Sequence, residues 1–188
     1  MPIETNDPNA LNTELKLKKN GKQKAWSIFK NVLLYGIVFL IIYTAVNWWR
    51  QPIMPANPQL QLTDYQGQTL DLAQMSSEQP TLVYFWGTWC PICTYTSPTI
   101  DKLVMSANYP VVTIAIKSGS DRELQSYMQQ NNYNFPIIND EDGTIFANWQ
   151  GQVTPSYVIL KDGEMKQGLT GIQPLWSLKL RLWLGSVF

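Results

Sequence analysis

The hydrophobic and polar positions divide the chain into a polar start, one long apolar run, and a remainder in which short apolar stretches alternate with polar ones. No charged residue occurs from Asn31 to Trp49, and the run is apolar around its whole helical circumference. As a helix it would rise roughly 28 Å, about the thickness of the hydrocarbon core of a bilayer. Trp26 before it, and Trp48 with Trp49 at its end, lie where interfacial aromatic residues belong. The pattern predicts a transmembrane anchor over residues 25–49.

Two alternatives to an anchor are a buried helix of a soluble domain and a cleaved signal peptide. The uniformly apolar circumference disfavours the buried helix. The long basic region, the length of the apolar run and the Asn47-Trp48-Trp49 sequence, in place of small residues, disfavour cleavage. Six lysines precede the run, whereas Arg50 alone follows closely, so the positive-inside rule places the N-terminus in the cytoplasm.

These signals predict four parts of the chain: a basic cytoplasmic tail at 1–24, the anchor at 25–49, a linker with three prolines at 50–58, and a globular domain at 59–188. In a bacterium, a chain organised in this way is expected to be a single-pass protein of the inner, cytoplasmic membrane. Its globular domain would lie in the periplasm or another extracytoplasmic space, where disulfide chemistry is possible.

Within the globular part, short apolar stretches predict strands, and apolar residues at helical spacing predict the helices between them. We expect strands at Leu60–Leu62 and Thr69–Leu72, paired as a hairpin around Asp64–Gly67, and at Thr81–Trp86, Val111–Ile116, Phe135–Ile138, Tyr157–Leu160 and Glu164–Leu169. We expect helices from Pro91 to about Ala107, with Pro98 inside, and at Asp121–Asn131, Gly143–Trp149 and Leu175–Leu184. Alternating strands and helices indicate an α/β sandwich with a mixed sheet.

Composition narrows the possible functions. The chain has 188 residues, with 14 basic and 14 acidic side chains, and this balance gives no support for nucleic-acid binding. It has only two cysteines, too few for a disulfide scaffold, and no histidine. The two cysteines therefore need a local explanation.

The cysteines are three positions apart and directly follow the expected strand Thr81–Trp86. Pro91 suits the first position of a helix, which places Cys90 at or beside the N-cap. Unpaired N–H groups and the helix dipole stabilise a thiolate there. We expect Cys90 to be the exposed nucleophile and Cys93, one turn inward, to resolve a mixed disulfide.

Other roles for the pair remain open. A structural zinc site needs about four nitrogen or sulfur ligands, and the chain supplies two thiols and no imidazole. Two thiols suffice for Cu(I), which favours soft ligands. An inert structural disulfide would close a small loop and stabilise little. A docking domain that uses the same scaffold without catalysis is a further alternative.

The sequence Trp89-Cys-Pro-Ile-Cys93 resembles the Trp-Cys-x-x-Cys site of the thioredoxin superfamily. The resemblance covers about residues 60–186 and includes four further features: Pro98, Thr154-Pro155-Ser156, the hairpin Lys161–Glu164, and Gly171. It implies a thioredoxin-like fold with an N-terminal hairpin and a central insertion around Gly119–Asp140. The chain is most similar to the membrane-tethered TlpA, ResA and CcmG group, especially its ScsD-like branch, which is linked to copper tolerance.

The resemblance implies an exported thiol–disulfide oxidoreductase whose redox centre is the Cys90–Cys93 disulfide, with no other cofactor and no metal. It implies that Trp89, Pro91, Thr154 and Pro155 contact the substrate, and that the Thr154–Pro155 bond is cis. The partners would be exported proteins with thiols or disulfides, and a membrane electron donor or acceptor. We expect a reductase, because the group mostly reduces and no histidine lies between the cysteines; a thiol oxidase is the alternative.

Two positions depart from the family pattern. Thioredoxins carry a buried aspartate six residues before the first cysteine, where this chain has Tyr84. ResA relatives carry a glutamate three residues after the second cysteine, where this chain has Thr96. The usual proton acceptor for Cys93 is therefore missing. Lys117, at the end of the expected strand Val111–Ile116, either points toward the site or is solvated.

Overall fold

The structure is a computed structural model that describes residues 26, 28–46, 49, 61–64, 67–106 and 108–187. The chain divides into one unit up to Val46 and another from Asn47. In the first, Ile28–Val46 forms a helix of 19 residues that is long and apolar enough to cross a membrane, by length and composition. The predicted tail at 1–24 and linker at 50–58 lie outside the described residues, as do Trp48, Leu60 and Ala107.

The second unit alternates strands and helices. Its strands are β1 (Gln61–Thr63), β2 (Thr69–Asp71), β3 (Thr81–Trp86), β4 (Val111–Ile116), β5 (Ile137–Asp140), β6 (Ser156–Lys161) and β7 (Glu164–Thr170). Its helices are α2 (Leu72–Glu78), α3 (Pro91–Met105), α4 (Asp121–Asn131), α5 (Thr144–Asn148) and α6 (Leu175–Val187). Most predicted elements are present within a few residues, and α6 extends three residues beyond the predicted end.

Five strands form the central sheet in the order β5-β4-β3-β6-β7, and β1 pairs with β2 in a separate hairpin. Strand β4 is parallel to both β3 and β5, whereas β6 is antiparallel to both β3 and β7. The predicted mixed sheet is confirmed. The segment Gly119–Asp140, expected as an insertion, forms α4 and β5 and supplies one edge of this sheet.

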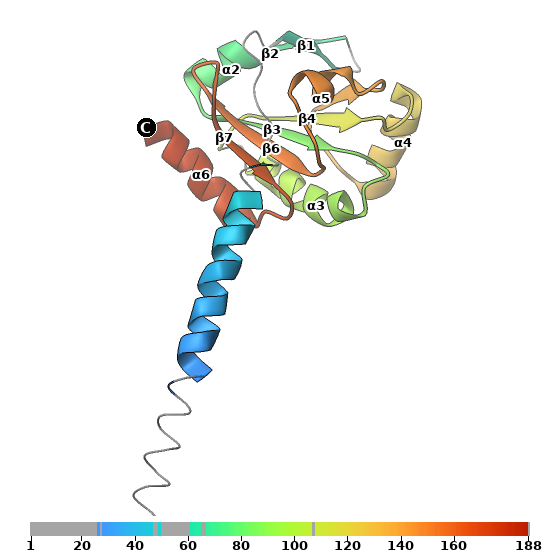
Figure 1. Ribbon diagram of the computed structural model, residues 1–188. Coiled ribbons are helices and arrows are strands. Elements are labelled where there is room, and N and C mark those ends of the chain that lie inside the picture. The colour runs from blue at the N-terminus through green and yellow to red at the C-terminus, as the bar shows by residue number, and fades with distance from the viewer. Residues whose placement is uncertain are drawn as a thin grey trace, which may run out of the picture. The chain divides into compact units, whose positions relative to one another are not determined.

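Helices cover both faces of the sheet (Figure 1). Because successive side chains of a strand point to opposite faces, β3 contributes to two cores. Leu82, Tyr84 and Trp86 pack on one face with buried residues of α3, α4 and α6. Val83 and Phe85 pack on the other with α2, α5 and the β1–β2 hairpin. A strand buried on both faces lies at the centre of the domain, and its C-terminal end leads to the cysteines.

Helix α2 was not predicted, and the expected strand Thr69–Leu72 is wrong at its last residue. The strand ends at Asp71, whose carboxylate accepts a hydrogen bond from the N–H of Gln74 at 3.0 Å and so caps the helix that begins at Leu72. The apolar residues Leu70 and Leu72 alternate as they would in a strand, so periodicity alone did not reveal the change.

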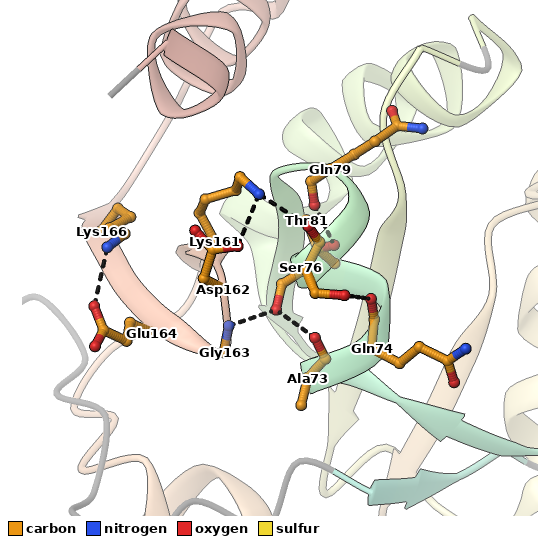
Figure 2. Close-up of polar contacts among 11 residues, drawn as sticks. Ala73, Gln74, Ser76, Gln79, Thr81, Lys161, Asp162, Gly163, Glu164 and Lys166 are labelled. Atoms are coloured by element: carbon orange, nitrogen blue, oxygen red, sulfur yellow. Dashed lines mark hydrogen bonds and ion pairs between the residues drawn. The ribbon is translucent and has the colours of Figure 1, made fainter.

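Helix α2 is tied to the turn between β6 and β7 by Ser76 (Figure 2). The fully buried hydroxyl of Ser76 accepts from the N–H of Gly163 at 2.9 Å, and its carbonyl accepts from the N–H of Asp162, also at 2.9 Å. Lys161 adds a hydrogen bond from Nζ to the carbonyl of Ser77 at 3.0 Å. These contacts join parts of the chain that are more than eighty residues apart.

Strand β5 begins two residues later than the predicted Phe135–Ile138. Pro136 has no N–H to donate to a ladder, although its carbonyl accepts from the N–H of Thr113 at 3.1 Å. Pairing therefore starts at Ile137, opposite Thr113. The strand continues to Asp140, whose buried carboxylate caps α5 by accepting from the N–H groups of Ile145 and Phe146, each at 2.9 Å.

Candidate active site

The two cysteines lie at the start of α3, directly after the loop that follows β3. Cys90 is the N-cap residue, with extended backbone angles, and Pro91 is the first helical residue. The N–H of Cys93 donates to Sγ of Cys90 at 3.2 Å, so the sulfur occupies the place that a capping oxygen usually takes. Cys90 and Cys93 are joined by a disulfide. This local geometry follows from a proline one position after the first cysteine.

The expected exposure of Cys90 is wrong for this disulfide-bonded state. Cys90 is 5% exposed and Cys93 is 1% exposed. The sulfur of Cys90 turns back over the first turn of α3, where it meets both the sulfur and the N–H of Cys93. Cys90 is slightly more exposed than Cys93, and its assignment as the attacking thiol stays a prediction.

The loop before Cys90 is held by the end of β4. The indole Nε1 of Trp89 donates to the carbonyl of Ile116 at 2.8 Å, and the N–H of Thr88 donates to Oγ of Ser118 at 3.0 Å. A Cβ on Gly87 would lie 2.6 Å from Nε1 of Trp89, so only glycine leaves room for this arrangement. The loop therefore presents Trp89, which is 56% exposed, in a defined orientation beside the disulfide.

Trp86 and Trp89 have different surroundings. Trp86 is fully buried and packs with Tyr127 and Phe135, at ring-centroid distances of 5.8 and 5.6 Å. Trp86 is therefore a core residue.

Ser118 supports the loop before Cys90, because it accepts from the N–H of Thr88 and donates to the carbonyl of Ile116 at 3.0 Å. No motif in the sequence indicated this role.

The Thr154–Pro155 segment reaches the same end of the sheet. Phe85 of β3 pairs with Ser156 of β6, so Pro155 lies one residue beyond this pair, at the end of β3 that leads to the cysteines. The Thr154–Pro155 peptide bond is cis. The carbonyl of Pro155 accepts from the N–H of Gly171 at 2.9 Å, which fastens this loop to the end of β7. Pro155 is buried and Thr154 is half-buried.

The two positions that depart from the family pattern touch each other. The hydroxyl of Tyr84 lies 2.8 Å from Oγ1 of Thr96 and 3.2 Å from Oγ of Ser97, and all three side chains are buried. Oγ1 of Thr96 also donates to the carbonyl of Cys93 at 3.3 Å. Neutral hydroxyl groups therefore lie beside the first turns of α3, at the positions where the family pattern has an acidic side chain. Of these residues, only Ser97 was not singled out by sequence.

A second buried phenol extends this group. Tyr157 stacks on Tyr84 with ring centroids 5.1 Å apart. Its hydroxyl has no hydrogen-bond partner of ordinary geometry in the part of the chain that the structure describes. Burial raises the pKa of Tyr157, the neighbouring phenol of Tyr84 raises it further, and the Thr96 hydroxyl opposes the rise.

Tyr84 does not replace the missing base. Burial raises the pKa of Tyr84 to about 12, although its hydrogen bonds to Ser97 and Thr96 oppose the rise. At pH 7 only about one molecule in 10⁵ would carry the phenolate. Tyr84 is therefore a hydrogen-bonding group at neutral pH and not a proton acceptor.

Lys117 lies at the end of β4 with an exposed side chain and a left-handed backbone (φ 46°). Its Cε packs close to Gly143, in the loop that precedes α5. The solvated interpretation of this lysine fits that position.

Comparison with known protein families matches residues 54–167 to the AhpC/TSA family. The chain belongs to this family. A relative described as a thioredoxin-like protein from Haemophilus influenzae is 37% identical over 166 residues, which cover 88% of this chain and 99% of the relative. The thiol-disulfide oxidoreductase ResA from Bacillus cereus is 24% identical over 158 residues, which cover 77% and 91% of the two chains.

Among solved structures, a secreted Mycobacterium tuberculosis disulfide oxidoreductase superposes with a TM-score of 0.55 at 24% identity, covering 69% of this chain and 96% of that one. The predicted thioredoxin-like fold and the predicted relationship to the group that contains ResA are confirmed. The assignment to the ScsD-like branch and the role of copper stay predictions.

Proposed function

We propose that this thioredoxin-like thiol–disulfide oxidoreductase is anchored in the bacterial inner membrane and reduces disulfides of exported proteins through Cys90 and Cys93. The observation that carries the proposal is the position of Cys90, whose sulfur caps α3 and is bonded to the less accessible Cys93. A thiolate at this position is stabilised by the N–H of Cys93 and by the positive end of the helix dipole.

Reduction would proceed in two exchange steps. The Cys90 thiolate attacks a substrate disulfide, forms a mixed disulfide and releases one substrate thiolate. The Cys93 thiolate then attacks Sγ of Cys90, closes the Cys90–Cys93 disulfide and releases the second substrate thiolate. Two electrons pass from the cysteine pair to the substrate, and a membrane dithiol donor must restore them. Trp89, which directly precedes Cys90, and the Thr154–Pro155 loop, which lies at the same end of the sheet, would contact the substrate chain.

The catalytic proposal is tested by trapping. Cys93→Ser retains the proposed nucleophile but cannot resolve the mixed disulfide, so it should accumulate covalent complexes with exported proteins. Such complexes disappear on reduction and are visible on non-reducing gels. Cys90→Ser is the matched control and should trap none. If neither variant traps a partner, a docking domain without catalysis explains the cysteine pair better.

The direction of electron flow is tested by the redox equilibrium of the Cys90–Cys93 pair with glutathione. A potential near that of thioredoxin, about −270 mV, is expected for a reductase. The absence of histidine between the cysteines, where Pro91 and Ile92 stand, supports this direction. A potential near that of DsbA, about −120 mV, would assign the protein to the thiol oxidases instead.

The anchor is supported by the helix Ile28–Val46, in which Lys30 is the only charged residue. Thr44 donates its hydroxyl to the carbonyls of Leu40 and Ile41, at 2.8 and 2.9 Å, so this polar group is satisfied within the helix. Full-length protein should remain in the membrane pellet after alkaline carbonate extraction, and added protease should digest the domain only from the extracytoplasmic side. Release into the soluble fraction with loss of the N-terminal segment would instead indicate a cleaved signal sequence.

A further inference from the structure

Helix α6 has an apolar face that no part of the described chain covers. Leu178 and Leu182 point into the core and are fully buried. On the other side, Trp176, Leu180 and Trp183 follow the i, i+4, i+7 spacing of one helical face. Their side chains are 70%, 47% and 53% exposed. We call these three residues the outer face of α6. A helix that is apolar on two sides requires something besides its own core to cover it.

Two cations border the outer face. Lys179 and Arg181 precede and follow Leu180, so each lies about 100° from it around the helix. Helix α6 contains no acidic residue, and neither cation takes part in an ion pair among the described residues. Within the described part of the chain, Arg181 donates to two neutral partners, Oε1 of Gln167 at 2.9 Å and Oγ of Ser177 at 3.4 Å. The surface that covers this face should therefore be apolar with an anionic border.

The size of the outer face argues against a second copy of the chain. An aromatic side chain buries about 150–250 Å² when it is fully covered, and these three side chains are already partly buried. Together they offer less than the roughly 800 Å² per partner that a stable interface needs, so a second copy would require further contacts beyond the outer face. A bilayer surface needs no such area, because it covers whatever apolar face lies against it and attracts the flanking cations.

The length of the chain keeps the domain close to a bilayer if the helix Ile28–Val46 is the anchor. Residues 47–60, 14 in number, separate Val46 from β1. Fully extended, they span at most about 50 Å. We propose that the outer face of α6 docks on the surface of the anchoring membrane, with Trp176 and Trp183 at the headgroup level and Lys179 and Arg181 on anionic phospholipid. This inference rests on the anchor in the proposed function but not on its redox chemistry.

The test is photolabelling of full-length protein in nanodiscs, using a phospholipid that carries a diazirine near its headgroup. In phosphatidylglycerol nanodiscs, peptides from both the anchor and α6 should be labelled. In Trp176→Ser/Trp183→Ser, label on α6 should fall several-fold while label on the anchor is retained. In phosphatidylcholine nanodiscs, label on α6 of the unchanged protein should also fall. Disulfide exchange by the variant at the unchanged rate shows that the domain is folded, because neither tryptophan belongs to the redox site.

Met105→Ser is the matched control, because it removes another exposed apolar side chain, at the end of α3, and should leave label on α6 unchanged. Labelled anchor with unlabelled α6 would overturn the docking proposal and leave the proposed function intact. Equal label on α6 with and without the two tryptophans would also overturn it, as would an outer face protected in a dimer. An unlabelled anchor would overturn the anchor itself, and the docking proposal with it.

Discussion

Replacing Tyr84 by phenylalanine removes one buried hydroxyl and leaves the aromatic ring in place. The ring stacks on Tyr157 and Trp86, at centroid distances of 5.1 and 6.4 Å, and these contacts need no hydroxyl. The hydroxyl bonds Thr96 and Ser97. Thr96 keeps the carbonyl of Cys93 as a partner, but buried Ser97 loses the phenol. Tyr84→Phe should therefore lower the free energy of unfolding by about 1–3 kcal/mol.

Tyr157→Phe is the matched control, because it removes a hydroxyl of the same kind from the adjacent ring. Both tyrosines are fully buried, but the hydroxyl of Tyr157 has no hydrogen-bond partner of ordinary geometry within the described chain. Its removal should leave stability unchanged or raise it slightly. The measurement is urea unfolding of the oxidised unit 47–188, which contains both core clusters. Equal losses for the two variants would refute the assigned role of the Tyr84 hydrogen bonds.

The buried hydroxyl of Tyr84 should also make the free energy of unfolding depend on pH. Burial raises the pKa of Tyr84 from its usual 10.0 to about 12 in the folded protein. Between these values the unfolded chain loses the phenolic proton and the folded chain keeps it. The contribution to stability is therefore complete below pH 10 and is lost as pH rises toward 12. By pH 11 the loss should reach roughly 1 kcal/mol.

Tyr84→Phe lacks this loss, so the stability difference between it and the parent protein should narrow by about 1 kcal/mol from pH 8 to pH 11. Urea unfolding at these two pH values, with brief exposure to alkali, measures the change. Thiols do not contribute in the oxidised protein, because both cysteines are in the disulfide. If the stability difference between the parent protein and Tyr84→Phe stays constant or grows from pH 8 to pH 11, the hydroxyl of Tyr84 does not keep a raised pKa in the folded protein.

Three further predictions concern two buried polar contacts, those of Ser76 and Asp140, and the loop before Cys90. Ser76→Ala removes a buried acceptor and should lower the free energy of unfolding, measured in urea, by about 1–2 kcal/mol. Ser77→Ala, on the exposed side of α2, should change it by less than about 0.5 kcal/mol. Equal losses would argue against the Ser76 contact. Asp140→Asn keeps one acceptor for the two N–H groups at the start of α5 and should cost about 1 kcal/mol; no loss in the same assay would show that the cap is dispensable. Gly87→Ala should displace the indole of Trp89 and slow disulfide exchange more than it lowers stability; an unchanged exchange rate would show that the orientation of Trp89 does not matter.

The sequence by itself determined the elements whose signals are local. Pro91 after Cys90 is a start signal for α3. The bounds of α4 were predicted correctly, and in the structure the carboxylate of Glu123 accepts from the N–H of its N-cap residue Ser120 at 2.8 Å. The apolar runs of β3 and β4 are long enough to indicate buried strands without knowledge of their partners. The proximity of the two cysteines also follows from local structure alone, because residues three apart on a helix are neighbours.

Tertiary structure decided what depends on residues distant in the chain. The hydrogen bond from Trp89 to Ile116 joins positions 27 residues apart, and the buried contact of Tyr84 with Thr96 joins a strand to the helix that follows it. Each reflects how α3 and β4 pack against β3, and no sequence pattern showed that the two residues of either contact meet. The resemblance to the family showed that an acid is missing at two positions, those of Tyr84 and Thr96. Only the packed core showed that the hydroxyls of these two residues bond each other, because burial removes water and leaves each polar group to bond its neighbour.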